Sequence, residues 1–144
     1  MAIDRSAHAT WEGDLKGGSG RFDLTSSQAI TGEEVTFASR FEPESGGKTS
    51  PEELIAAAHA SCFSMALSHA LAQAGNPPDE LNTSATVTFQ PGEGITKIAL
   101  TVEGRVPGLD AAAFEEAAQG AKANCPVSKA LASVPEITLA ATLA

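Results

Sequence analysis

The sequence predicts an α+β fold in which antiparallel strands surround a few helices. Short alternating runs fill the first third of the chain, and a single apolar helical stretch follows them. A hairpin, two further helices and a last strand complete the order, and we expect no strand–helix–strand crossover. With 144 residues, the chain is expected to form one domain, residues 1–144, with a sizeable core.

The first third is predicted to be β-structure. The runs HATWEGDL, GRFDLTS and EVTFASRF are separated by KGGSG and SQAITGE, which are rich in turn-forming residues. In EVTFASRF the alternation of a strand would put Val35, Phe37 and Phe41 on one face and Arg40 on the other. A loop, EPESGGKT, then leads to the long helix.

The stretch SPEELIAAAHASCFSMALSHALAQAG predicts one helix of about 24 residues. Ser50 suits the N-cap, Pro51 the first helical position, and Glu53 completes a capping box. The strong stop is GNPP at residues 75–78. The helix is apolar nearly all round, which is typical of an element buried on most sides. One chain has little material to wrap it, and a second copy could supply the rest.

The remaining elements follow in order after this helix. LNTSATVTFQ and ITKIALTVEGRV, joined by PGEG, predict a hairpin with one face on the helices. GLDAAAFEEAAQGAKAN predicts a helix that begins near Asp110, and PVSKALASV predicts a short helix directly after Cys125. EITLAATL is the predicted last strand.

Composition restricts the class of partner. The net charge of −9 and the pI near 4.6 argue against a nucleic acid or an anionic membrane as partner. The N-terminus lacks the layout of a signal peptide, and polar residues interrupt the long helix too often for a membrane span. We therefore expect a cytoplasmic protein, in which two cysteines are catalytic, redox-active or inert rather than a structural disulfide.

Cys62 lies in the middle of the long helix and Cys125 just before Pro126. A cysteine on an apolar helix face can be a small core residue, and His59 and His69 on the same face also suggest a metal or Cys–His site. That face offers no acidic third ligand, which disfavours the metal. Cys125 occupies an N-cap-like position, where free N–H groups favour a thiolate. Together the two cysteines suggest an attacking and a resolving thiol.

A reactive Cys62 would need a nearby cation, because the helix dipole does not act at mid-helix. Arg40 is the candidate, since its planar guanidinium could hold a thiolate or a peroxide oxygen. Arg21, in GSGRF, is the competing donor. An arginine exposed to solvent on a strand is the alternative for both.

PEELIAAAHASCFSMAL, followed 63 positions after Cys62 by AKANCPVSKAL, resembles the OsmC branch of the OsmC/Ohr family. These are thiol-dependent peroxidases that reduce organic hydroperoxides, and the resemblance covers nearly the whole chain. It implies that Cys62 is the peroxidatic cysteine, Cys125 the resolving cysteine, Arg40 the active-site arginine and Glu52 its glutamate. In Ohr-type members the arginine comes earlier in the chain, near Arg21.

The resemblance also implies an intertwined homodimer with two long central helices and antiparallel sheets around them. Glu52 and Cys62 are about 15 Å apart along a straight helix, so one guanidinium cannot pair with both in a single chain. We therefore predict a site built across the dimer interface. The expected substrate pocket is lined by Phe41, Ile55 and Met65 and favours alkyl or lipid hydroperoxides.

The expected chemistry needs no cofactor, because sulfur carries the electrons; no metal, haem or flavin is predicted. An external dithiol must reopen the disulfide, and the resemblance implies lipoylated proteins and a role in oxidative or osmotic stress defence. Two other functions remain open from the residues alone. One is a dimeric small-molecule binding module with incidental thiols, and the other is a Cys–His hydrolase that uses Cys62 and His59.

Overall fold

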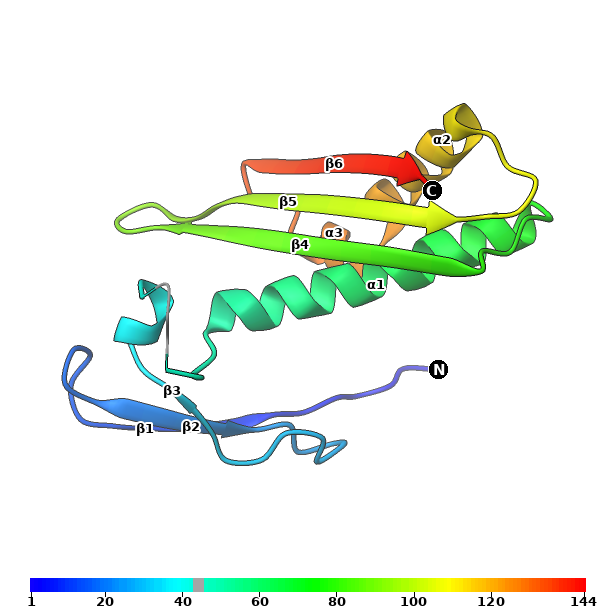
Figure 1. The fold of residues 1–144 in the computed structure, drawn as a ribbon. Helices are drawn as coiled ribbons and strands as arrows, with labels where there is room; N and C mark the ends of the chain where they lie inside the picture. Colours follow the sequence, from blue (N-terminus) through cyan, green and yellow to red (C-terminus); the bar gives the residue numbers. More distant parts are fainter. Residues whose placement is uncertain (43–45) are drawn as a thin grey trace. The chain divides into compact units, whose positions relative to one another are not determined.

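The computed structural model describes residues 1–42 and 46–144, which divide into two compact units (Figure 1). Unit 1 is Met1–Pro51 and unit 2 is Glu52–Ala144. Part of the predicted loop EPESGGKT, residues 43–45, lies outside the described residues. The α+β class predicted from the sequence is confirmed, and each unit contains one three-stranded sheet.

Unit 1 is an antiparallel sheet in the order β1-β2-β3, with strands His8–Glu12, Ser19–Asp23 and Glu33–Val35. Trp11 pairs with Gly20 across the first two strands. A Cβ at Gly20 would lie 2.7 Å from the Trp11 ring, so only glycine allows the indole to lie over this backbone. The three strands predicted in this part of the chain are therefore confirmed, although their ends differ.

The strand predicted over EVTFASRF ends early, at Val35, and the expected alternation through Arg40 is wrong. Ala38–Arg40 forms a short 3₁₀-helix, η1. Thr36 and Ser39 cause this change, because each side-chain oxygen accepts a hydrogen bond from the other residue's backbone N–H, at 3.1 and 3.3 Å. Such local bonds compete with a sheet ladder. The turn stacks Phe37 on Phe41 edge to face, with ring centroids 5.0 Å apart.

The long helix of unit 2, α1 (Pro51–Gln73), has 23 residues, which confirms the predicted length. It ends where the sequence places the stop. The Asn76 N–H donates to the Leu71 carbonyl at 2.9 Å and the Gly75 N–H to the Ala72 carbonyl at 3.0 Å, with Gly75 at φ +90°. This is a Schellman ending, whose left-handed residue is normally glycine.

One face of α1 is buried in the chain. His59, Phe63, Leu67 and Leu71 recur every four residues and are all nearly inaccessible. By length and composition alone α1 is also long and apolar enough to cross a membrane. Its buried stripe packs against the sheet and the second helix of unit 2. Met65, on another face, is 67% exposed. Burial of those other faces by a second copy stays a prediction.

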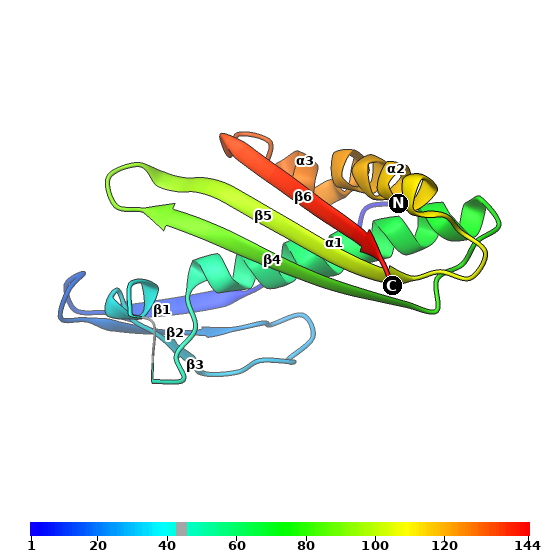
Figure 2. The same ribbon diagram turned by 45° about the horizontal axis from the view of Figure 1, so that its top comes forward.

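The sheet of unit 2 has the order β4-β5-β6, with strands Glu80–Gln90, Gly94–Arg105 and Glu136–Leu143. β4 and β5 form the predicted antiparallel hairpin. β6 runs parallel to β5, as Figure 2 shows, so the prediction of a purely antiparallel fold without a crossover is wrong. The reason is that α2 (Ala111–Asn124) and α3 (Pro126–Ala130) carry the chain back to the starting end of β5.

The three helices pack on one face of this sheet. Phe63 and Leu67 of α1 share a buried cluster with Leu100 of β5 and with Phe114 and Ala118 of α2. Asp110 caps α2 as predicted, since its carboxylate accepts a hydrogen bond from the Ala113 N–H at 2.8 Å. The hydrophobic core therefore fixes α1 against the α2–α3 connection, where Cys125 lies.

Candidate active site

The two cysteines of the chain meet inside unit 2. Cys62 projects from the middle of α1 and is half-buried, whereas Cys125 is fully buried between α2 and α3. Both are free thiols, Cys62 packs against the core cluster that contains Cys125, and each thiol shifts the pKa of the other. The sequence could not show whether the two residues approach each other. The fold brings them into contact.

The backbone around Cys125 ends one helix and begins the next. Its N–H donates to the Ala121 carbonyl at 2.8 Å, and its carbonyl accepts from the Lys129 N–H at 3.1 Å. Pro126 occupies the first position of α3, as its fixed φ favours. Cys125 therefore lies at the helix N-terminus that the sequence predicts.

The groups around Cys125 favour its thiolate. Burial by itself raises the pKa of Cys125, but hydrogen bonds from Cys62, from the Ser128 N–H and hydroxyl, and from the Val127 N–H outweigh it. The pKa of Cys125 is therefore lowered, as at other helix N-termini that bind anions.

Cys62 has the opposite balance. Burial raises the pKa of Cys62, the hydrogen bond with Cys125 raises it further, and the Val127 N–H acts in the other direction. Cys62 lies eleven residues after Pro51, too far along α1 for the N-terminus of its own helix to act on it, and the Val127 N–H of α3 does not outweigh the burial and the effect of Cys125. A thiolate at Cys62 therefore needs a cation beyond the contacts that unit 2 itself provides.

Arg40 belongs to unit 1, where it lies in the last turn of η1. It lines a cavity of about 210 Å³ together with Trp11, Leu15, Phe37 and Pro51, among others. Aromatic and aliphatic carbon makes up most of this lining. Phe41, which the sequence assigns to the substrate pocket, is 43% exposed and contacts Phe37.

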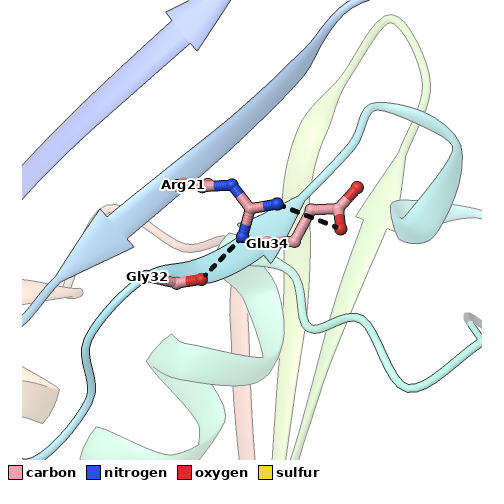
Figure 3. Close-up of polar contacts among 3 residues, drawn as sticks. All are labelled: Arg21, Gly32 and Glu34. Carbon is pink, nitrogen blue, oxygen red and sulfur yellow. Dashed lines mark hydrogen bonds and ion pairs between the residues drawn. The ribbon is translucent and has the colours of Figure 1, made fainter.

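Arg21, the competing arginine, is bound within its own sheet (Figure 3). Its Nη1 donates to the Gly32 carbonyl at 3.0 Å, and its Nη2 lies 4.0 Å from the Glu34 carboxylate. The Arg21 side chain is 66% exposed. It therefore has a structural partner on the neighbouring strand.

The remaining predicted site residues lie along α1. Glu52, in the first turn, is only 7% exposed, while Glu53 beside it is exposed. Ile55 is half-buried. Met65 lines a groove of about 500 Å³ with His69, Ala72 and the 78–81 segment, and Cys62 is not among the described residues that line it. Met65 is therefore not shown beside the thiols.

His59 has a partner that the sequence did not reveal. Its Nε2 lies 2.7 Å from the Ser128 hydroxyl, and both residues are buried. His59 precedes Cys62 by three residues and Ser128 follows Cys125 by three, which puts each one helical turn from a cysteine. The spacing relates each residue to a cysteine, but it does not indicate that His59 and Ser128 contact each other. The described residues contain no group of three side chains suited to a metal ion.

Comparisons with a family model, with curated proteins and with solved structures all identify OsmC-like proteins as similar to this chain. The family described as OsmC-like protein matches residues 44–140. The relative named Peroxiredoxin OsmC from Escherichia coli (strain K12) is 49% identical over 142 residues, 96% of each chain, and the Shigella flexneri relative of that name gives the same values. The chain belongs to the OsmC-like family, as the segments around its two cysteines predicted.

Solved structures show the same fold. The OsmC-like protein from Mycoplasma pneumoniae superposes with a TM-score of 0.70 at 15% identity, covering 99% of each chain. The organic hydroperoxide resistance protein OhrB of Bacillus subtilis gives a TM-score of 0.61 at 24% identity, covering 96% of this chain and 98% of that one. These likenesses establish an OsmC-like fold.

Proposed function

We propose that this protein is a thiol-dependent peroxidase that reduces organic hydroperoxides to alcohols in oxidative or osmotic stress defence. The observation that carries the proposal is the contact between Cys62 and Cys125, the only two cysteines of the chain. The 49% identity to proteins named Peroxiredoxin OsmC supports peroxidase chemistry at such a pair.

Cys62 is the proposed peroxidatic cysteine because it is half-buried and a peroxide can reach it, whereas Cys125 is inaccessible. Its thiolate attacks the distal oxygen of the hydroperoxide and the O–O bond breaks. The departing alkoxide takes up one proton from solvent and leaves as the alcohol. Cys62 becomes a sulfenic acid. Cys125 attacks that sulfur to form an intrachain disulfide, and water leaves.

Arg40 is the proposed cation for the Cys62 thiolate. The raised pKa of Cys62 within unit 2 explains why a cation is needed. Arg40 is preferred to Arg21 because its position in SRFE matches the active-site arginine of the OsmC branch. Glu52 is proposed to hold the guanidinium, and its low exposure is compatible with a paired carboxylate.

A homodimer is part of the proposal. Glu52 and Cys62 are about 15 Å apart along α1, so an Arg40 that touches both must join two subunits. The exposed apolar residues of α1, including Met65, are suited to a second copy. The protein is proposed to act in the cytoplasm, where an external dithiol, such as a lipoylated protein, reopens the disulfide.

Substrate preference follows from the apolar lining beside Arg40. Trp11, Leu15 and Phe37 of this lining would bury the alkyl group of a hydroperoxide, which hydrogen peroxide lacks. We expect a higher kcat/KM for cumene hydroperoxide than for hydrogen peroxide. Equal values would contradict the substrate class but not the thiol chemistry.

The deciding experiment is mass spectrometry of the reduced protein after one equivalent of tert-butyl hydroperoxide per subunit. We expect a loss of two hydrogens that maps to a Cys62–Cys125 disulfide within one chain. The matched variants are Cys62→Ser, which should not react, and Cys125→Ser, which should hold a dimedone-trappable sulfenic acid at Cys62. Unmodified thiols and unconsumed peroxide would refute the proposal and favour a binding module.

A further inference from the structure

A buried histidine that the proposed chemistry does not use lies next to the thiol pair. His59 is fully buried on the core face of α1, one turn before Cys62. Its Nε2 is 2.7 Å from the Oγ of Ser128, which comes from α3, 69 residues further along the chain. A buried polar contact of this kind fixes the two elements, and the side chains that make it, relative to each other.

Ser128 extends this contact to the resolving thiol. Ser128 lies three residues after Cys125, in the first turn of α3, and its hydroxyl and backbone N–H help to lower the pKa of Cys125. Cys62 and Cys125 in turn shift each other's pKa. His59, Ser128, Cys125 and Cys62 thus form one group of side chains. A hydrogen bond joins His59 to Ser128, and Ser128 and Cys62 each act on the pKa of Cys125. Three of the four residues are buried and the last is half-buried.

The direction of the hydrogen bond between His59 and Ser128 follows from the histidine ring. Among the described residues, Nδ1 of His59 is buried and has no hydrogen-bond partner. An orphaned N–H is rarer in proteins than an orphaned acceptor, so the proton belongs on Nε2. Burial also lowers the pKa of His59, which keeps the ring neutral. Nε2–H therefore donates to Ser128, and the Ser128 hydroxyl is left to donate to Cys125.

We propose that His59 is a positioning residue for the resolving step and acts through Ser128. By occupying the acceptor side of the Ser128 hydroxyl, it directs the hydroxyl proton at the sulfur of Cys125 and stabilises the thiolate there. This inference rests on the proposed peroxidase function and deepens it. It assigns the second half of the catalytic cycle to residues outside the two cysteines.

The step balances as follows. Cys125 loses its proton, and its thiolate attacks the sulfenic sulfur of Cys62. The S–S bond forms while the S–O bond breaks, and the departing hydroxide takes up one proton to leave as water. The sulfenic sulfur is the oxidant and the Cys125 thiolate is the reductant, so no further reactant is needed.

The first test titrates Cys125 alone. In the Cys62→Ser background, the absorbance of the thiolate at 240 nm is followed against pH. Adding Ser128→Ala or His59→Leu should raise the midpoint by about one pH unit, a tenfold loss in the ionisation constant. Ser128→Thr and His59→Gln retain the hydrogen-bond donors, so their midpoints should equal that of the Cys62→Ser protein. His69 is exposed, and His69→Leu serves as the control. An unchanged midpoint in Ser128→Ala and His59→Leu would overturn the proposal.

Folding is checked by far-ultraviolet circular dichroism. If His59→Leu does not fold, His59→Gln is compared with His59→Asn, whose shorter amide cannot reach Ser128. The proposal predicts a higher midpoint for Asn than for Gln, and equal midpoints would contradict it. A purely structural histidine would change stability without moving the midpoint.

The second test measures the resolving step in proteins that retain both cysteines. One equivalent of tert-butyl hydroperoxide is added and disulfide formation is timed by quenching with dimedone. Ser128→Ala should slow disulfide formation about threefold, because a tenfold smaller thiolate fraction is partly offset by greater nucleophilicity. Oxidation of Cys62 itself should keep its rate. Equal rates of disulfide formation in Ser128→Ala and the parent would refute the role of His59 and Ser128 but not the peroxidase function. No oxidation in any variant would refute the peroxidase function, and the titration of Cys125 would then decide whether His59 and Ser128 stabilise its thiolate.

Discussion

Gly104 of β5 is a core position at which one added methyl group should clearly lower stability. It is buried, and its φ is not in the left-handed region, so the backbone itself accepts alanine. A Cβ there would lie 2.5 and 2.6 Å from two ring carbons of Phe114 and 3.2 Å from Leu81. Ordinary carbon contacts are about 3.5–4.0 Å, so the ring would have to move by about 1 Å. We expect Gly104→Ala to lower the free energy of unfolding by about 1–3 kcal/mol.

The assay is urea unfolding followed by far-ultraviolet circular dichroism at one fixed protein concentration, because any dimer makes stability depend on concentration. Gly120→Ala in α2 is the matched control. A Cβ there meets no atom within 4 Å, and alanine in a helix should add about 0.5–1 kcal/mol. Phe114→Leu combined with Gly104→Ala should show favourable coupling of about 1 kcal/mol. If Gly104→Ala is as stable as Gly120→Ala, the packing argument is refuted.

Three further predictions concern single residues. Burial lowers the pKa of His59 below 6.5, so under acidic conditions the unfolded chain binds more protons at this residue than the folded chain does. The free energy of unfolding should therefore fall as the pH drops below 6.5, by at most about 1.4 kcal/mol per pH unit. His59→Gln should remove that part of the slope in urea titrations at several pH values, and an unchanged slope would exclude His59 as its source. Asp110→Ala should lower the free energy of unfolding by about 1 kcal/mol through loss of the cap, and an unchanged urea midpoint would contradict this. Arg40→Lys should reduce kcat/KM for cumene hydroperoxide more than about tenfold while Arg21→Lys changes it little; the reverse order would transfer the role to Arg21.

The helices could be predicted from the sequence because their ends are marked locally. Pro51 and Gly75 bracket α1, and Asp110 marks the start of α2. The last strand was also found at its observed bounds, Glu136–Leu143. Its direction was not, because whether a strand pairs parallel or antiparallel depends on the path of the helices before it and not on its own pattern.

The site was only partly predictable for the same reason. The hydrogen bonds between Thr36 and Ser39 form η1 and place Arg40 in a 3₁₀-helix, although EVTFASRF has the alternating pattern of a strand. The partner of His59 lies 69 residues away, and a single sequence carries no direct signal for such a pair. The two cysteines were recognisable because each lies in a distinctive segment, while the roles of Arg40 and Glu52 stay predictions.

The parallel pairing of β6 with β5 also has a consequence for how the chain folds. The β4–β5 hairpin closes between neighbours such as Gln90 and Gly94, whereas β6 joins Lys97 to Glu136 across two helices. Distant pairings form late because their loop entropy must be overcome first. We therefore expect a nascent chain to hold its hairpin well before Cys125 and Ser128 reach their final places. During that interval Cys62 and Cys125 are exposed to solvent, so an oxidant present during synthesis would oxidise them before the fold brings the two thiols together.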